Sequence, residues 1–376
     1  MTTTTPTEGL EDIVAAHSHI CELDGKLGRL SYFGVDIHDL ANFASFEETA
    51  YLLWHGTLPT RAQLDEVKKQ LQAARALPQP VSDFMSTLPK TSTPMDVLRT
   101  TVSALSMFDP APDDKSPAAN RRRALQLTAV MPTIVAAWNH LRNGEKPVQP
   151  LADQDHATNF LYMLTGTMPD PAVAKMLDIV LTLHADHELN ASTFAARVTA
   201  GTLAGMYAAI TSAIGALSGP LHGGANEQVM RMLLKIGEPS QTETYLEGAL
   251  ARKERIMGFG HRVYKTEDPR ATHLRKMSEE LGQRTGDSRW YEMSRRIEAY
   301  IKQHKGLNAN VDFYSASTYY MMDIPIDLDT PIFACSRITG WTSHVLEQYD
   351  NNRLIRPRAE YVGPKNVTFV PLDQRK

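Results

Sequence analysis

At the centre of the chain stands Ser218-Gly219-Pro220-Leu221-His222-Gly223-Gly224-Ala225-Asn226, in which a single histidine follows a long run of small and apolar residues. Glycine lets the backbone approach a ligand closely, and proline restricts the backbone torsion where the turn begins. We therefore expect His222 to project from a tight turn, just before a helix that begins near Asn226.

Two later stretches have the same glycine-rich and polar character. They are Gly258-Phe259-Gly260-His261-Arg262-Val263-Tyr264-Lys265 and Asn310-Val311-Asp312-Phe313-Tyr314-Ser315. No serine elbow or activated cysteine accompanies them, so a nucleophilic triad fits poorly. Two histidines and an aspartate better suit acid–base chemistry at a carbon acid. The aspartate would remove a proton while a neutral histidine donates a hydrogen bond to the enolate oxygen.

The composition is that of an ordinary soluble protein. The chain has 376 residues, of which 42% are hydrophobic and 22% charged, enough for one large or two ordinary domains. The formal net charge is −4, and acidic and basic residues are scattered along the chain. This pattern predicts neither a nucleic acid nor a membrane surface as a partner.

Cysteine content and the first residues bear on the compartment. The two cysteines, Cys21 and Cys335, are too few for a disulfide framework or a cysteine-based metal site. Residues 1–9 form a threonine-rich polar tail without the basic and apolar regions of a secretory signal. We therefore expect the protein to be cytoplasmic.

Helix signals dominate the chain. Residues 45–56 begin with an N-cap serine, continue with acidic residues and end on glycine. Residues 193–217 predict one long helix. Its part from residue 200 onward carries no charge but is only weakly apolar, which indicates a buried helix of a soluble protein and not a membrane-spanning helix. Residues 30–37 alternate enough to predict a short strand or hairpin. The fold class is therefore mainly α, with a hint of two lobes.

A polar cluster at residues 184–193 raises the question of a metal. Its histidines, His184 and His187, are three residues apart on a predicted helix end, a spacing that zinc sites use. No second cluster has matching ligand spacing, so we expect no metal there. Contact with a ligand, or a buried histidine with satisfied hydrogen bonds, fits the cluster better.

The glycine-rich stretch at residues 258–265 is only a fragment of a dinucleotide loop, since the third glycine and the preceding strand are missing. Its glycines are followed by Arg262, Lys265 and Arg270, which suit a backbone wrapped around an anionic ligand. The alternative for each of these cations is a solvated helix face.

Taken together, the three motifs closely resemble the signatures of citrate synthase. Further segments that look like family segments follow in family order, at residues 45–59, 94–99, 159–164, 184–194 and 336–337. The chain resembles the short, dimeric bacterial and archaeal type. The resemblance implies a two-domain helical fold, in which residues 1–219 and 323–376 form a large domain around an inserted small domain, residues 220–322.

The resemblance also implies catalytic roles. Asp312 matches the base that takes a proton from the methyl group of acetyl-CoA. His222 matches the group that stabilises the resulting enol, and His261 matches the group that polarises and protonates the ketone of oxaloacetate. The citryl-CoA formed in this way would be hydrolysed to citrate and CoA, without a bound cofactor or metal.

Binding residues follow from the same resemblance. His187, Arg270 and Arg337 match groups that bind the carboxylates of oxaloacetate, for which guanidinium groups are chemically suited. Arg356 matches an arginine that is lent to the neighbouring subunit's site, which implies a homodimer. The implied CoA contacts are Met257, Gly258, Phe259, Gly260, Lys265 and Arg358.

Three alternatives remain open at this point. The first is 2-methylcitrate synthase, which shares these motifs and uses propionyl-CoA, alone or as a second activity. The second is a metal-dependent hydrolase built on His184 and His187. The third is a helical interaction scaffold with a degenerate site, against which the intact trio of His222, His261 and Asp312 argues.

Overall fold

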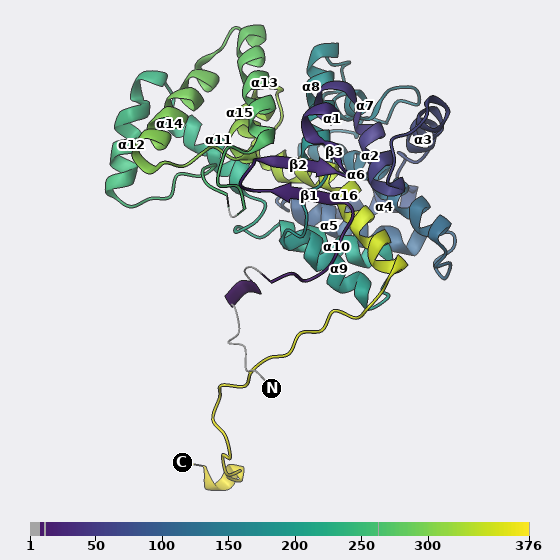
Figure 1. Ribbon diagram of the computed structural model, residues 1–376. Coiled ribbons are helices and arrows are strands. Elements are labelled where there is room, and N and C mark those ends of the chain that lie inside the picture. The colour runs from purple at the N-terminus through teal and green to yellow at the C-terminus, as the bar shows by residue number, and fades with distance from the viewer. Residues whose placement is uncertain (1–7, 11–12, 262, 376) are drawn as a thin grey trace.

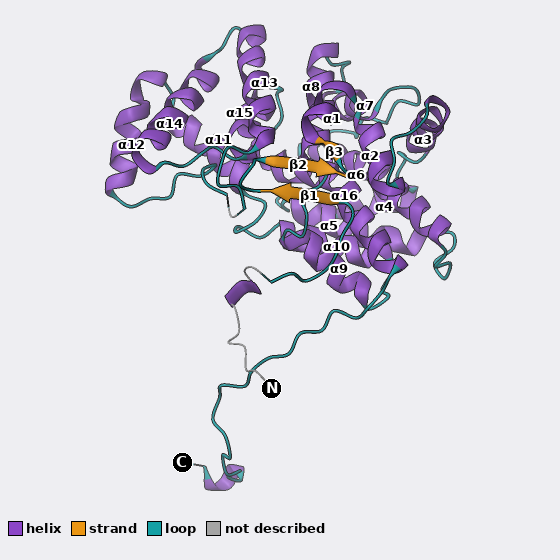
Figure 2. Cartoon of the chain, viewed as in Figure 1, coloured by secondary structure: helices purple, strands orange, loops and turns teal. Residues whose placement is uncertain are grey.

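A computed structural model of the chain describes residues 8–10, 13–261 and 263–375. Within these residues it contains sixteen α-helices and one small three-stranded sheet (Figures 1 and 2). The prediction of a mainly α fold is confirmed. Arg262 and most of the threonine-rich tail lie outside the described residues.

The helices before the central histidine turn form the larger part of the chain. Their bounds are α1 Ile37–Phe43, α2 Phe46–His55, α3 Arg61–Ala73, α4 Gln79–Thr87, α5 Pro94–Leu105, α6 Pro117–Arg142, α7 His156–Thr165, α8 Pro171–His184, α9 Ala191–Gly201 and α10 Met206–Leu217. After it come α11 Ala225–Ile236, α12 Thr242–Ala251, α13 Pro269–Thr285, α14 Arg289–Lys305, α15 Val311–Met321 and α16 Asp329–Asp350.

Local capping explains where several helices begin and end. Ser45 and Glu48 form a reciprocal capping box at the start of α2, and Gly56 closes the helix with a left-handed φ of 75°. Helix α6 begins at Pro117, because Ser116 caps it and proline is favoured in the first turn. Short-range signals of this kind account for most helix ends.

The sheet is an antiparallel meander of β1 Cys21–Asp24, β2 Arg29–Tyr32 and β3 Val35–Asp36. The predicted hairpin at residues 30–37 is therefore confirmed, and β1 is an addition to it. The turn between β1 and β2 packs against the glycine-rich loop, since the carbonyl of Gly25 accepts a hydrogen bond from the backbone N–H of Lys265 at 2.8 Å.

The prediction of one helix over residues 193–217 is wrong. The segment forms two helices, α9 and α10, which pack against each other and are joined by a turn. Leu203 has a φ of 63° in this turn, and Gly205 stands at the N-cap of α10. Glycine has the lowest helix propensity apart from proline, so breaking the helix beside Gly201 and Gly205 costs little free energy. Among the described helices, none combines the length and the apolar character that a bilayer crossing requires.

Helix α16 lies at the centre of the larger lobe, where it contacts α2, α6, α8, α9 and α10. Helices α11–α15 contact one another and form a second lobe, on the left of Figure 1. Contacts of α13 with α1 and α8, and of α11 with α16, join the two lobes. After α16 the chain is extended and runs away from both lobes (Figure 1).

Candidate active site

The turn that carries His222 lies between α10 and α11, as its glycines predict. The carbonyl of Gly219 accepts hydrogen bonds from the backbone N–H groups of His222 at 2.9 Å and of Gly223 at 3.3 Å. A Cβ atom on Gly223 would overlap the carbonyl of Leu217, so only glycine fits at this position. The turn is thereby held tightly against the end of α10.

The His222 ring is held by the beginning of α9. Its Nε2 accepts a hydrogen bond from the backbone N–H of Ser192 at 3.2 Å and lies 2.8 Å from the Ser192 Oγ. A backbone N–H can only donate, so the neutral ring carries its proton on Nδ1. Burial, with a contribution from Arg337, lowers the pKa of His222 to about 4, so the ring is neutral near pH 7.

The glycine-rich loop lies beside the start of α15 because the two segments pair through their backbones. The N–H of Gly260 donates to the carbonyl of Asn308, and the N–H of Asn310 donates to the carbonyl of Gly258, both at 2.9 Å. Gly258 has a φ of 82°, and a Cβ atom there would lie 2.8 Å from the ring of Phe313. This pairing brings His261 and Asp312 to the same region.

His261 has the opposite tautomer to His222. Its Nδ1 accepts hydrogen bonds from the backbone N–H groups of Val263 at 3.0 Å and Tyr264 at 3.2 Å, so the neutral ring carries its proton on Nε2. Burial, with a smaller contribution from Arg270, lowers the pKa of His261 to about 4. Both imidazoles are therefore neutral hydrogen-bond donors, each from a defined nitrogen.

Asp312 lies in the first turn of α15, which Asn310 caps by accepting the backbone N–H of Asp312 at 3.1 Å. Burial raises the pKa of Asp312 to about 6, against the opposing effect of the Arg270 and Arg337 charges. The described part of the chain shows no hydrogen-bond donor to its carboxylate. A partly buried carboxylate with a raised pKa is suited to accept a proton from carbon.

Arg270 and Arg337 are both 2% exposed and place two positive charges at the site. Arg270 forms a bidentate pair with the buried Asp268, through Nε at 2.9 Å and Nη2 at 2.7 Å. The Nε of Arg337 donates to the carbonyl of His184 at 2.7 Å, and its guanidinium lies over the ring of Phe333. Each arginine thus has one edge fixed by the protein.

His187 projects from the loop between α8 and α9 towards the second lobe. Its ring lies edge-on to His261 with centroids 5.2 Å apart, and its Nε2 lies 3.3 Å from the Tyr264 hydroxyl. Burial, the Arg270 charge and the neighbouring His261 together lower the pKa of His187 well below its ordinary value. The ring is therefore neutral and close to both arginines.

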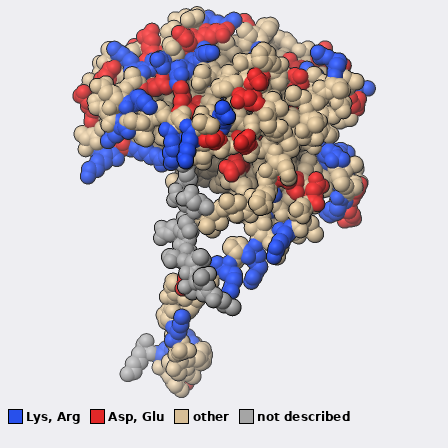
Figure 3. Space-filling model, in the orientation of Figure 1, with Lys and Arg blue, Asp and Glu red and all other residues tan. Residues whose placement is uncertain are grey.

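Of the remaining predicted residues, Met257 is half-buried and Phe259 is buried, and the others line a cavity or lie on the C-terminal segment. Gly260 and Lys265 line a cavity of about 230 Å³, together with His261, Tyr264, Thr266, Asp268 and residues 306–309. Arg356 and Arg358 are exposed on the extended segment after α16, and that segment runs away from both lobes (Figure 1). Figure 3 shows lysine and arginine side chains along that segment.

The two histidines considered for a metal have different surroundings. His184 is fully buried, with its Nδ1 2.8 Å from the Val180 carbonyl and its ring edge-on to Phe333. His187 instead contacts His261 and Tyr264. In the described residues, no group of three or more His, Cys, Asp and Glu side chains is arranged to hold a metal ion.

Two residues that hold the site were given no role in the sequence interpretation. Ser192 contacts His222, and its Oγ accepts a hydrogen bond from Trp341 Nε1 at 3.1 Å. Asn190 caps helix α9, and its side chain accepts a hydrogen bond from the backbone N–H of Ser192. A position in the first turn after a helix-capping residue is a sequence feature that could have indicated Ser192. Trp341 carried no comparable signal, since only the packing of α16 against α9 brings it there.

Comparisons with known proteins agree with this geometry. The family described as "Citrate synthase, C-terminal domain" matches residues 9–358. A citrate synthase 2 of Bacillus subtilis is 52% identical, with 99% of this chain and all of that protein covered. A 2-methylcitrate synthase of Shewanella oneidensis is 43% identical, with 92% of each chain covered.

The solved structures include a citrate synthase from Thermoplasma acidophilum in ternary complex with carboxymethyl coenzyme A and oxaloacetate. It is 33% identical and superimposes with a TM-score of 0.94, covering 99% of this chain and all of that chain. The prediction of a citrate synthase-like fold is thereby confirmed. Because the family match and these relatives extend over nearly the whole sequence, the chain belongs to the citrate synthase family.

Proposed function

We propose that the chain condenses acetyl-CoA with oxaloacetate and hydrolyses the citryl-CoA to citrate and CoA, with Asp312, His222 and His261 as its acid–base groups. The chain is an enzyme of the citrate synthase family, an acyltransferase that converts the acyl group into an alkyl group on transfer. The observation that carries the residue roles is the set of two neutral imidazoles with opposite tautomers and a carboxylate with a raised pKa, each of which is affected by the charge of Arg270, Arg337 or both.

The proposed chemistry follows from these donors and acceptors. The Asp312 carboxylate takes a proton from the methyl carbon of acetyl-CoA, and the Nδ1–H of His222 donates to the thioester oxygen as its negative charge develops. The nucleophilic carbon then attacks the ketone carbon of oxaloacetate. The Nε2–H of His261 donates to the ketone oxygen and transfers its proton to that oxygen as the new carbon–carbon bond forms.

Carboxylate binding is assigned to His187, Arg270 and Arg337. The neighbouring charges support this assignment, because Arg270 and Arg337 both act on His187 and Asp312. The bidentate pair with Asp268 leaves the Nη1 of Arg270 free of that carboxylate. Two buried guanidinium groups with part of their donors available suit a small dicarboxylate.

The CoA moiety is assigned to the glycine-rich loop and its cavity. Residues 257–260 would offer backbone groups to the adenine, and Lys265 would face the phosphates. Arg358 is a further candidate, supplied by the extended C-terminal segment. The cavity beside Gly260 and Lys265 supports this placement because it adjoins His261 directly.

A homodimer is proposed from the extended C-terminal segment. Large apolar side chains are exposed along it, including Val362 at 90%, Phe369 at 78% and Leu354 at 55%. Such a segment is stabilised when it lies on another surface. We assign that surface to a second copy of the chain, whose site would then receive Arg356.

Two further proposals complete the description. Residues 220–322 form a small domain that closes over oxaloacetate and excludes water until condensation has occurred. The described residues of this region, α11–α15, contact the rest of the chain through only a few helices. We also place the enzyme in the cytoplasm, in keeping with its two unpaired cysteines.

The test is thiol release from acetyl-CoA and from propionyl-CoA, each with and without oxaloacetate, on EDTA-treated protein. We expect oxaloacetate-dependent release that favours acetyl-CoA. A preference for propionyl-CoA would support the second candidate, 2-methylcitrate synthesis, to which the Shewanella oneidensis relative points. Absence of release with both substrates would overturn the proposed activity.

A further inference from the structure

The loop that carries His187, residues 185–190, is held from behind by α16. The N–H of Gly340 donates to the carbonyl of Ala185 at 3.0 Å, and a Cβ atom on Gly340 would overlap the Asp186 side chain. Arg337, one turn earlier on α16, holds the preceding carbonyl of His184. The backbone of the loop therefore lies directly against the backbone of this helix.

Within the loop, a buried carboxylate holds a strained residue. Glu188 has a φ of 54°, a left-handed conformation that costs a non-glycine residue free energy. The Oδ2 of Asp186 accepts the backbone N–H of Glu188 at 3.1 Å. Asp186 is fully buried, so the carboxylate itself needs donors from the protein.

His344 on α16 is that donor. Its Nε2 lies 3.3 Å from Oδ1 and 3.4 Å from Oδ2 of Asp186, and its ring is also fully buried. Burial opposes ionisation of Asp186, but the hydrogen bond from His344 and the positive charge of Arg337 lower the pKa of this carboxyl. Asp186 is thus a buried carboxylate that depends on its neighbours to stay charged.

The direction of these hydrogen bonds is set by Arg197 on α9. Its Nη1 lies 3.1 Å from His344 Nδ1, and a guanidinium group can only donate. His344 Nδ1 therefore accepts, which leaves the ring proton on Nε2, facing Asp186. Arg197 is itself 4% exposed. Its Nε donates to Oε1 of Gln348 at 3.0 Å, and its Nη1 donates to the Glu347 carboxylate.

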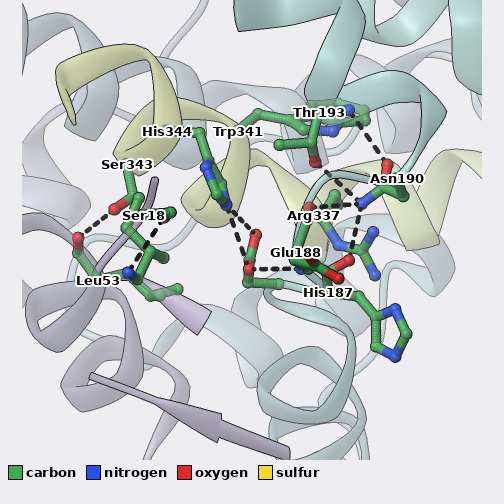
Figure 4. Close-up of polar contacts among 12 residues, drawn as sticks. Ser18, Leu53, His187, Glu188, Asn190, Thr193, Arg337, Trp341, Ser343 and His344 are labelled. Carbon is green, nitrogen blue, oxygen red and sulfur yellow. Dashed lines mark hydrogen bonds and ion pairs between the residues drawn. The ribbon is translucent and has the colours of Figure 1, made fainter. Parts of the chain in front are cut away.

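We propose that His344 is a positioning residue for oxaloacetate binding. Its Nε2–H holds the Asp186 carboxylate, Asp186 holds Glu188 in the left-handed conformation, and that conformation directs His187 into the site. Figure 4 shows His344 on one side of Glu188 and the His187 ring projecting on the other. The inference rests on the proposed function, because it takes His187 to contact oxaloacetate.

The test compares two amides at position 344. In His344→Asn the amide lies near the Nδ1 position and still meets Arg197, but Asp186 loses the side-chain donor from α16 and keeps only the Glu188 N–H among the donors described above. In His344→Gln the longer side chain carries its NH2 group to the Nε2 position. We expect His344→Asn to raise the KM for oxaloacetate about tenfold, since a buried group loses its partner. The KM for acetyl-CoA should stay within twofold and kcat within threefold, and His344→Gln should restore the oxaloacetate KM.

Ser343→Ala is the matched control on the same helix. Ser343 Oγ donates to the carbonyl of Leu53 on α2, away from the loop (Figure 4). We expect this variant to lose some stability without a change in the oxaloacetate KM. An equal rise in KM for Ser343→Ala and His344→Asn would overturn the proposal, because it would show a general effect of disturbing α16.

Glu188→Gly supplies a second background, in which the positive φ is no longer strained. There we expect His344→Asn to raise the oxaloacetate KM by less than about threefold. If His344→Asn alone does not fold, the oxaloacetate KM is compared between Glu188→Gly and the double variant instead. A tenfold rise that persists in it, or a wild-type KM for His344→Asn alone, would overturn the proposal. Wild-type protein without oxaloacetate-dependent thiol release would instead overturn the proposed function, so the two failures are distinguishable.

Discussion

The backbone N–H of Ser192 donates to Nε2 of His222 at 3.2 Å, whereas at His261 it is Nδ1 that accepts backbone N–H groups. The two candidate catalytic imidazoles therefore present opposite nitrogens as donors to the site. This difference has a direct consequence for substitutions at the two positions.

The amide nitrogen of asparagine matches the Nδ1 position of histidine, and that of glutamine matches Nε2. His222→Asn should therefore keep a donor that His222→Gln loses, and the order should reverse at His261. The amide that keeps the donor should lower kcat by about 10²-fold, and the amide that loses it should lower kcat by about 10⁴-fold. Both values lie within the range for acid–base groups. Steady-state citrate formation checks this, and the same order of amides at both positions would contradict the tautomers.

The pH dependence of kcat/KM should report Asp312. Its pKa of about 6 means that the basic carboxylate predominates above pH 6, so kcat/KM should fall about tenfold per pH unit below it. His222 and His261, with pKa values of about 4, remain neutral over this range. A kcat/KM that stays flat from pH 7 to pH 5 would remove Asp312 as the base.

Asp312→Asn should stabilise the protein while removing its activity. The pKa is raised from 3.8 to about 6 on folding, so the folded state binds the proton more tightly than the unfolded state. Wild-type stability therefore falls as pH rises from about 4 to 6, and the full cost is present above pH 6. We expect the variant to gain about 1–3 kcal/mol in free energy of unfolding at pH 8 and little at pH 4, measured by urea denaturation. An equal gain at both pH values would show that the raised pKa is not its source.

Mixed dimers test whether Arg356 serves the neighbouring site. Asp312→Ala and Arg356→Ala homodimers should each be nearly inactive. When the two chains are refolded together in equal amounts, half of the dimers combine one chain of each kind, and each of these has one complete site. Activity should then return to about a quarter of the wild-type value. No recovery on mixing would show that Arg356 acts on its own chain or not at all.

Gly340→Ala should destabilise the protein through the loop that carries His187. The added Cβ would overlap Asp186 and the carbonyl of Ala185, neither of which can move freely. We expect a loss of about 1–3 kcal/mol in free energy of unfolding and weaker oxaloacetate binding. Gly248→Ala on α12 is the control, since its Cβ would meet only the flexible Arg252 guanidinium. That variant should be neutral or slightly more stable.

Much of the fold was predictable because its signals are short-range. A serine cap, a terminal glycine and an apolar period act over a few residues, as Ser45 and Gly56 do at the two ends of α2. The break at Leu203 was missed for the complementary reason. The apolar pattern continues through it, and the turn is favoured only because α9 and α10 can pack against each other and against α16.

The helical class and the chemical groups of the site follow from the amino-acid order alone, since residue types and glycine positions are written directly in the three motifs. Three features depend instead on the folded chain: which nitrogen of each histidine donates, how far burial raises the pKa of Asp312, and the place of His344 behind the His187 loop. They depend on it because the residues involved are far apart along the chain. Ser192 is 30 residues from His222, and His344 is 158 residues from Asp186, so desolvation and hydrogen-bond direction arise only when folding brings such groups together.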